Sequence, residues 1–301
     1  MVMEIFHIKQ TSDLVISDSV CAIGFFDGLH LGHQELLKRV ERISNEKKLK
    51  KALMTFSIHP KSILGNEDVK YLMSLDDKIE ILENRGFDYL FIIDFNSDVA
   101  DLLPDEFIND FLIKNHIKHI VCGFDFHFGK KGIGSANDFK NSLEVDVIDK
   151  YVVDDFKVSS TLIKQLLLEG NVDKANYLLS RPYSITGEVI YGLQNGRKIG
   201  FPTANIKLND YVPLKRGVYG VYLLLDNKKY LAMANIGLNP TVGKIDCLSL
   251  EINIFDFDDD IYGKEVTVCF IFRVRDERCF SSLDELKKQL HIDKEYIKSH
   301  F

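Results

Sequence analysis

Two histidines three residues apart stand in a glycine-containing segment that could handle phosphate groups. His30 and His33 close the string Gly24–His33, which follows an apolar run and opens an amphipathic one. Residues with this spacing at a helix start share one face, and a helix N-terminus favours anions. Two imidazoles there could stabilise the charge that builds on a phosphate as a phosphorus–oxygen bond breaks. The pair alone would also fit a metal pair or two surface histidines, but the whole string favours phosphate chemistry.

A second glycine-containing segment lies much later in the chain. Gly196 and Gly200 flank Arg197 and Lys198, and the string continues as Phe-Pro-Thr-Ala-Asn to Asn205. Backbone amides and cations in such a loop can surround a polyphosphate. The hydroxyl of Thr203, within that string, could serve as a Mg²⁺ ligand. The alternative is a glycine-rich hairpin with surface cations, and the full string is too specific for it.

Acidic residues stand at three further places in the chain. Glu251 lies in a strand-like run, where a lone glutamate is usually solvent-facing. Asp125 follows a predicted strand, so it fits a turn residue as well as a contact to a ligand at the edge of a sheet. The run Asp258–Asp260 is expected to be a solvated turn and not a metal site.

The elements that must position these residues change character along the chain. Between 19 and 158, nearly continuous apolar runs alternate with amphipathic stretches, which predicts a parallel sheet with both faces buried and ligands at the carboxyl ends of its strands. The predicted strands are 20–26, 51–58, 89–95, 119–126 and 145–153. The predicted helices between them begin near residues 31, 75 and 104. The last begins with Pro104 and acidic residues, which is a good helix start.

After Pro182 the pattern becomes that of an antiparallel all-β domain, which we expect to be a small barrel. An amphipathic helix is expected to follow the barrel near the end of the chain. Two helical stretches, 159–170 and 172–180, precede this change. With 301 residues, two domains are expected, and we place them at 1–181 and 182–301. Ser160 and Thr161 open the first of the two helices, where they fit a plain N-cap or a contact to nucleotide phosphates.

The first half resembles the nucleotidylyl transferase superfamily, and its FDGxHxGH string resembles the adenylylating domain of bacterial FAD synthetases. Further segments match that family's motifs: Thr55-Phe56 with His59-Pro60, Gly123–Gly129, and Ser159–Lys164. His127 and Lys164 stand where the family usually has arginine. The resemblance implies a Rossmann-like domain in which His30 and His33 are catalytic and in which the nucleotide is bound by Gly24, Phe25, Asp27, Gly28, Gly32, Asp125, Ser160, Thr161 and Lys164.

The second half resembles riboflavin kinases, whose motif GRxLGFPTAN appears here with Ile199 as the one conservative change. The segments Gly217–Tyr222, Asn235–Gly237 with Pro240-Thr241, and Arg275–Phe280 match as well. The resemblance implies that Glu251 is the base, that Thr203 and Asn205 hold Mg²⁺, and that Arg275 and Glu277 bind flavin. It also implies nucleotide contacts by Gly196, Arg197, Gly200, Pro202 and Asn205.

Together the motifs imply the order and activities of a bifunctional riboflavin kinase/FAD synthetase. Riboflavin would be phosphorylated by ATP to FMN, and FMN adenylylated by a second ATP to FAD, with Mg²⁺ at both sites. His127 and Lys164 motivate one alternative, a kinase whose first domain has lost adenylylation and acts as a flavin-binding regulatory module. A second alternative, a relative of aminoacyl-tRNA synthetases, is disfavoured because residues 1–180 carry a net charge of −8, from 21 basic and 29 acidic residues.

Composition limits the class of protein further. The net charge of −7 makes long nucleic acid an unexpected partner, and the absence of a long apolar run makes a membrane an unexpected one. Five cysteines without a CxxC pair suggest reduced, buried thiols. With no predicted signal peptide, we expect a cytoplasmic enzyme whose partners are riboflavin, FMN and ATP. The sequence leaves the oligomeric state open.

Overall fold

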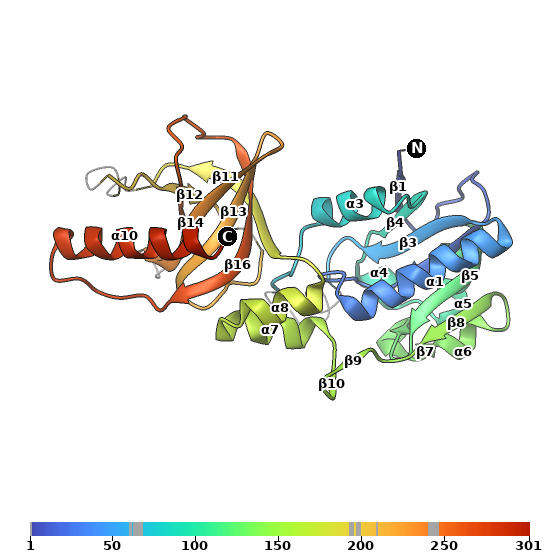
Figure 1. Cartoon of the computed structure of the whole chain (residues 1–301). Coiled ribbons are helices and arrows are strands. Elements are labelled where there is room, and N and C mark those ends of the chain that lie inside the picture. Colours follow the sequence, from blue (N-terminus) through green and yellow to red (C-terminus); the bar gives the residue numbers. More distant parts are fainter. Residues whose placement is uncertain are drawn as a thin grey trace. The chain divides into compact units, whose positions relative to one another are not determined.

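The computed structural model describes residues 2–59, 62, 69–192, 196, 200–208, 210–239 and 247–301. It forms two compact units (Figure 1). The first unit gathers Met1–Val69 and Leu75–Ser159, and the second gathers Lys70–Ser74 and Ser160–Phe301. The helices between 160 and 179 therefore group with the second unit, although our predicted boundary at Arg181–Pro182 assigns them to the first domain. As a boundary between folding domains, 181/182 stays a prediction.

The first unit is built on a six-stranded parallel sheet, as predicted. Its spatial order is β1 (Glu4–Ile8), β4 (Tyr89–Ile93), β3 (Lys50–Phe56), β2 (Ser19–Ile23), β5 (Ile117–Gly123) and β8 (Glu144–Ile148). Strand β1 was not predicted. It pairs with β4 from Glu4↔Tyr89 to Ile8↔Ile93 at the edge of the sheet, and its short alternating sequence lacks the continuous apolar run of the central strands.

The central strands are apolar throughout because both faces of the sheet are covered. One face packs in a core with Phe107, Phe111 and Phe139, whereas neighbouring residues of β2 such as Ala22 are buried toward the other face, where α1 lies against β2, β3 and β5. The helices and turns of this unit are α1 (Leu31–Lys47), α3 (Leu75–Asn84), α4 (Ser97–Ala100), α5 (Pro104–Phe107), α6 (Ala136–Phe139) and the 3₁₀ turn η2 (Lys130–Gly132).

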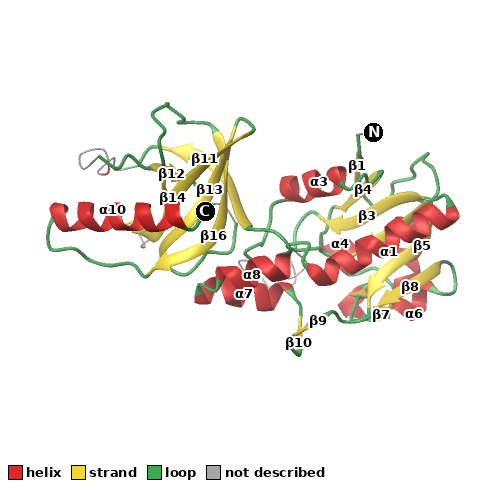
Figure 2. Ribbon diagram, in the orientation of Figure 1, coloured by secondary structure: helices red, strands yellow, loops and turns green. Residues whose placement is uncertain are grey.

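The helix predicted to begin at Pro104 starts there but changes pitch after one turn. It continues as the π-helical stretch η1 (Ile108–Ile113), which sequence periodicity does not distinguish from an α-helix. Among its described residues the unit also has two small antiparallel pairs. They are β6 (His127–Phe128) with β7 (Gly134–Ser135), and β9 (Val152–Val153) with β10 (Phe156–Lys157), which Figure 2 labels.

The second unit contains the predicted antiparallel barrel, and the barrel is closed. Its strands run in the order β11 (Tyr183–Ile190), β12 (Ala204–Ile206), β15 (Cys247–Ile254), β14 (Lys228–Asn239), β13 (Gly217–Leu225) and β16 (Glu265–Arg275), which returns to β11. Buried and less buried residues alternate along β11, as expected for a strand with one face toward the interior. Closure leaves the barrel sheet without open edges.

Helices α8 (Val172–Leu179) and α10 (Leu283–Ser299) pack on this barrel, and α7 (Ser160–Glu169) packs on α8. Helix α8 lies against β11 and β16, and α10 lies against β14. A bidentate ion pair fastens α10, because the Arg275 guanidinium donates to both carboxylate oxygens of the buried Asp293 at 2.7–3.1 Å. The terminal helix is therefore fixed to the last barrel strand.

No helix within the described residues is long and apolar enough to span a bilayer. The prediction of buried thiols holds for Cys21 and Cys122, and burial raises the pKa of Cys122 to about 11. Cys279, by contrast, is exposed because it follows the end of β16 in a loop.

Candidate functional site

The histidine pair lies where strand β2 passes into helix α1. His30 is the N-cap of α1, and its Nδ1 accepts a hydrogen bond from the backbone N–H of His33 at 3.3 Å. The two rings stack at 3.7 Å between centroids and within 11° of parallel. Gly32 leaves room for this stack, because a Cβ at this position would lie 3.2 Å from the His30 ring, closer than an ordinary contact. The predicted sharing of one face is confirmed.

This arrangement suits an anion. Since Nδ1 of His30 is an acceptor, a neutral His30 carries its proton on Nε2, which is then a donor. The first turn of α1 holds no acidic residue, so the positive end of the helix dipole is not neutralised locally. Two imidazoles and a helix N-terminus therefore converge on one point, as the sequence predicted.

The loop that carries the histidines is strained. Phe26 and Leu29 have φ values of 56° and 40°, and Gly28 lies between them at 84°. A non-glycine residue in this region costs on the order of 1–3 kcal/mol and persists only where its surroundings hold it. The Leu29 carbonyl accepts a 2.7 Å hydrogen bond from Gln34 Nε2, which fixes one end of the loop.

The other end of the loop is held by a buried lysine. Lys78 on α3 is 5% exposed, and its ammonium donates to the Phe25 carbonyl at 2.8 Å and to Thr55 Oγ1 at 3.2 Å. Thr55 Oγ1 in turn donates to the same carbonyl at 2.9 Å. Burial lowers the pKa of Lys78 to about 8, and the nearby charge of Asp27 opposes that shift.

Other predicted residues of this unit lie beyond the carboxyl ends of the parallel strands. Phe56 ends β3, and His127 and Gly129 follow β5. They line a pocket of about 200 Å³, together with Phe95, Val99, Ala100, Phe107, Phe128, Lys131 and Gly132. The pocket is rich in aromatic side chains, and His127 and Lys131 are exposed at its wall. The predicted ligand edge of the sheet thus has an apolar cavity with nearby cationic or titratable groups.

Asp125 lies in the turn after β5 and forms an ion pair with Lys157 of the β9–β10 hairpin. Gly24, Phe25, Asp27 and Gly28 all lie in the β2–α1 loop, and Asp27 is buried. Ser160, Thr161 and Lys164 belong to α7 in the second unit, where the Lys164 ammonium donates to the Lys70 carbonyl at 2.6 Å. Their predicted contact with the nucleotide of the histidine site stays a prediction.

In the second unit, Glu251 occupies the centre of a polar row across three barrel strands. On β15 it stands directly opposite Asn205 of β12 on one side and Asn235 of β14 on the other. Opposite residues of antiparallel strands point to the same face, so the three side chains share one face. Glu251 is partly buried. Burial raises the pKa of its carboxyl, and a hydrogen bond from the Thr203 hydroxyl opposes that shift.

The predicted glycine loop leads into this row. Gly196 accepts a 2.9 Å hydrogen bond from the Phe201 N–H through its carbonyl, and Gly200 has a φ of 79° that favours glycine. The Pro202 carbonyl accepts a 2.7 Å bond from Asn253 Nδ2. Arg197 lies outside the described residues, as do Pro60, Lys198, Ile199, Pro240 and Thr241.

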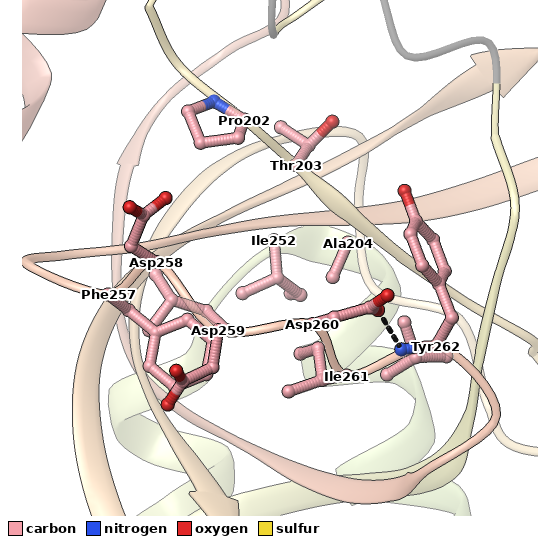
Figure 3. A pocket seen from close by; sticks show the side chains of 12 residues that line it. Pro202, Thr203, Ala204, Ile252, Phe257, Asp258, Asp259, Asp260, Ile261 and Tyr262 are labelled. Carbon is pink, nitrogen blue, oxygen red and sulfur yellow. Dashed lines mark hydrogen bonds between the residues drawn. The ribbon is translucent and has the colours of Figure 1, made fainter.

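A pocket of about 450 Å³ opens beside this segment (Figure 3). Pro202, Thr203 and Ala204 form one wall and the loop Phe257–Tyr262 forms another, with Ile252 between them. Asp258, Asp259 and Asp260 are exposed loop residues, as predicted, and Asp260 accepts a 3.0 Å bond from the Tyr262 N–H. The pocket is lined by apolar and polar side chains. One of the polar ones, Thr203, donates a hydrogen bond to the Glu251 carboxylate.

The two predicted flavin residues have different surroundings. The Arg275 guanidinium is engaged by Asp293, so its observed contact is with α10. The Glu277 carboxylate lies against Gly237, where a Cβ would come within 2.8 Å of Oε1, and 3.9 Å from Arg216. The same construction at Gly237 meets Asn235 at 3.2 Å. Glu277 therefore extends the polar row that contains Glu251.

Sequence reasoning missed Lys78 and Asp293 and gave Asn235 no role. For Lys78 a signal was present, because it stands three residues after Leu75 and four before Leu82, on the apolar face of a predicted amphipathic helix. A lysine on such a face is unusual unless its charge is satisfied. Asn235 lies in a segment that matches the riboflavin kinase family, but its place beside Glu251 emerges only from strand register.

Comparisons with known proteins match the two halves of the chain to two different families. The sequence pattern of a family described as FAD synthetase matches residues 13–162, and that of a family described as riboflavin kinase matches residues 179–301. Proteins named bifunctional riboflavin kinase/FMN adenylyltransferase are similar over nearly their whole length. That of Listeria monocytogenes is 38% identical, covering 98% of this chain and 96% of its own, and that of Bacillus subtilis is 37% identical, covering 99% and 98%.

The bifunctional riboflavin kinase/FMN adenylyltransferase of Escherichia coli strain K12 is 33% identical, with 94% of this chain and 92% of its own covered. A solved structure named as a macrolide-efflux protein from Streptococcus pneumoniae is 36% identical, with a TM-score of 0.91 and 99% of each chain covered. That name is said of the streptococcal protein, and the likeness shows that the two chains share a fold.

Proposed function

The chain belongs to the family of bacterial bifunctional riboflavin kinase/FMN adenylyltransferases, and from this premise we propose how its two units make FAD from riboflavin. The enzyme phosphorylates riboflavin with ATP to give FMN, and it then transfers AMP from a second ATP to FMN, which gives FAD and pyrophosphate. We assign the first reaction to the barrel unit and the second to the parallel-sheet unit. The observation that carries the assignment is that one unit has a polar row centred on the partly buried Glu251 and the other has a histidine pair at a helix N-terminus.

In the kinase reaction, Glu251 orients the 5′-hydroxyl of riboflavin and accepts its proton as the oxygen attacks the γ-phosphorus of ATP. The bond between that phosphorus and the bridging oxygen breaks, and ADP leaves. The 450 Å³ pocket beside Pro202–Ala204 receives the nucleotide, and the glycine loop with Gly196 and Gly200 surrounds its phosphates. Glu277 and Asn235 extend the row on the side where the flavin chain and its hydroxyls would lie. Arg275 supports this side by fixing α10.

The residues present suit a Mg²⁺ ion. In the parts of the chain that the structure describes, no cluster of three or more His, Cys, Asp or Glu side chains could hold a metal. Thr203 and Asn205, however, offer a hydroxyl and an amide oxygen beside the Glu251 carboxylate, and Mg²⁺ is typically held by few protein oxygens plus substrate phosphates. When bound there, Mg²⁺ neutralises charge on the transferred phosphoryl group.

Thr203→Val should impair the kinase by removing this candidate ligand while keeping the side chain's shape. Valine is β-branched like threonine, so the backbone preference is retained. We expect a rise in the Mg²⁺ concentration needed for half-maximal FMN formation and a fall in kcat of about tenfold or more. Titrating Mg²⁺ at saturating riboflavin and ATP measures both. Unchanged Mg²⁺ dependence and turnover would remove Thr203 from the metal site.

On acidification, the kinase should lose activity at a higher pH than it would if its base had the pKa of an ordinary glutamate. A base must be ionised, and burial raises the pKa of Glu251 above its usual value of about 4.3. The protonated, inactive fraction therefore grows at a higher pH than for an exposed carboxyl. The pH profile of kcat/KM for riboflavin, taken where circular dichroism shows the fold intact, should have its acidic limb above that value. A limb at or below it would contradict the assignment of Glu251 as base.

In the adenylylation, a phosphate oxygen of FMN attacks the α-phosphorus of ATP, and the bond to the pyrophosphate oxygen breaks. The attacking group is already an anion, so no general base is needed. His30 and His33 stabilise the charge on the pentavalent phosphorus and the departing pyrophosphate, and Gly24, Phe25, Asp27, Gly28 and Gly32 shape the loop around the nucleotide.

The aromatic pocket that ends with His127 and Lys131 suits the flavin ring of FMN, since flavins stack on aromatic side chains and this cavity lies at the carboxyl edge of the sheet. Asp125 adds a polar contact at that edge. Ser160, Thr161 and Lys164 are proposed to contact the ATP phosphates of this reaction through the N-terminus of α7.

We propose that the enzyme is cytoplasmic, with riboflavin, FMN and ATP as its partners and neither nucleic acid nor membrane among them. The kinase-only alternative is not favoured, because the histidine pair and its loop have the geometry described above and the FAD synthetase pattern covers the unit. Formation of FAD from FMN, ATP and Mg²⁺ above a blank without enzyme tests this point.

A further inference from the structure

Lys78 occupies a position that none of the reactions above explains. It is a buried cation on α3, and α3 supplies none of the residues assigned so far. A buried ammonium is costly unless its donors are satisfied, so its partners indicate its role. Those partners are the Phe25 carbonyl and the Thr55 hydroxyl, which themselves hydrogen-bond each other at 2.9 Å. The three groups form a closed triangle at the base of the β2–α1 loop.

The triangle fixes the orientation of the Phe25–Phe26 peptide, which leads into the histidine site. The Phe25 carbonyl belongs to the peptide bond with Phe26, whose φ of 56° lies in the left-handed region. The Phe26 side chain is 2% exposed, and its ring lies edge-on to His33 at 5.1 Å between centroids. The ring that packs on His33 therefore belongs to the residue directly after the carbonyl that Lys78 contacts.

The position of the ammonium is constrained from several directions. Its Nζ lies 5.1 Å above the Phe25 ring, so the same residue is contacted through its carbonyl and its aromatic face. Thr55 is fully buried at the end of β3, next to the strand that carries the loop. Rotation of the Phe25–Phe26 peptide would break two hydrogen bonds to this cluster, one of them from a charged donor.

We propose that Lys78 is a positioning residue for adenylyl transfer, which holds the strained Phe25–Leu29 segment so that His30 and His33 face the reacting phosphate. Lys78 acts through Phe25 and Thr55 and does not itself touch the substrate. This inference rests on the proposed adenylyl transfer at the histidine pair. It goes further because it makes a residue of a different helix, α3, responsible for the orientation of the two histidines.

Lys78→Met tests the proposal in the full-length enzyme, because methionine has a similar length and no donor. We expect kcat for FAD formation from FMN to fall about 30- to 100-fold, since small displacements of catalytic groups have effects of this size. FMN affinity, measured by quenching of flavin fluorescence, should change by less than about threefold. Riboflavin kinase activity of the same sample should be unchanged. Lys140→Met, which alters an exposed lysine of the same unit, is the matched control and should leave both activities intact.

Thr55 provides a second test that does not depend on how well the buried methionine is tolerated. Thr55→Val keeps the shape but removes the hydroxyl, whereas Thr55→Ser keeps the hydroxyl. The valine variant should lose FAD-forming kcat and the serine variant should retain it. With Lys78→Met added, the loss in Thr55→Val should be smaller than the product of the single losses, because both act on one carbonyl.

The possible outcomes separate this inference from the proposed function. If the wild-type enzyme makes no FAD from FMN, the adenylyl transfer itself is wrong. If the wild type makes FAD and Thr55→Val does so at the wild-type kcat, or if folded Lys78→Met does, the positioning role is wrong. A variant that loses FMN affinity and kcat in equal measure would also contradict it, because that result indicates general damage to the site.

Discussion

Glu251→Ala should abolish FMN formation and leave FAD formation from supplied FMN nearly unchanged. The Glu251 carboxylate stands between Asn205 and Asn235, and a positioned acceptor typically contributes about 10²–10⁴-fold to such a reaction. The substitution removes a partly buried polar side chain that belongs to the second unit. Product quantification by chromatography, with riboflavin in one assay and FMN in the other, measures the two activities separately.

Glu251→Gln sharpens this experiment because glutamine keeps the size of the side chain and loses the basic oxygen. It should be nearly as inactive in the kinase assay as the alanine variant. Glu265→Ala, which alters an exposed glutamate on another strand of the barrel, is the control and should behave as the wild type. Loss of both activities in a folded Glu251→Ala protein would refute the model of two separate sites.

His30→Asn should produce the converse phenotype. Asparagine is a favourable N-cap, so helix α1 keeps an acceptor for the His33 N–H while the imidazole is lost. Removing one preorganised donor from a site of charge development costs about 10²–10³-fold in kcat. We expect FAD formation to fall by that factor and riboflavin phosphorylation to continue at the wild-type rate.

His33→Ala should have an effect of similar size, since His33 stacks on His30 and shares its face of the helix. His7→Ala, at an exposed histidine of the same unit, provides the control. Full FAD-forming activity in His30→Asn would show that the histidine pair does not stabilise the transition state. Equal loss of both activities would mean instead that the substitution affects the whole protein.

The sequence predicted the central strands and the histidine site because their signals are local. A continuous apolar run marks a strand that is buried on both faces, and GFFDGxHxGH places its functional groups within ten residues. A small antiparallel barrel was also predicted, from strand-like runs with turn residues between them. Strand β1 was missed because an edge strand needs fewer apolar residues.

The parts that were missed depend on contacts distant in sequence. Lys78 reaches a carbonyl 53 positions away, and Arg275 pairs with Asp293 on a helix that its motif does not include. Asn235 becomes part of the Glu251 row only through the register of β14 against β15. Motif matching identifies residues that touch substrate, whereas the groups that hold those residues are identified by packing.

A time course of products from riboflavin, ATP and Mg²⁺ with the wild-type enzyme tests whether the two units act in sequence. We expect FMN to accumulate first and FAD then to appear at its expense, because FMN is the product of one unit and the substrate of the other. FMN that persists without FAD, at ATP concentrations that support the kinase, would contradict the assignment of adenylyl transfer to the first unit. The absence of both products would contradict the account as a whole.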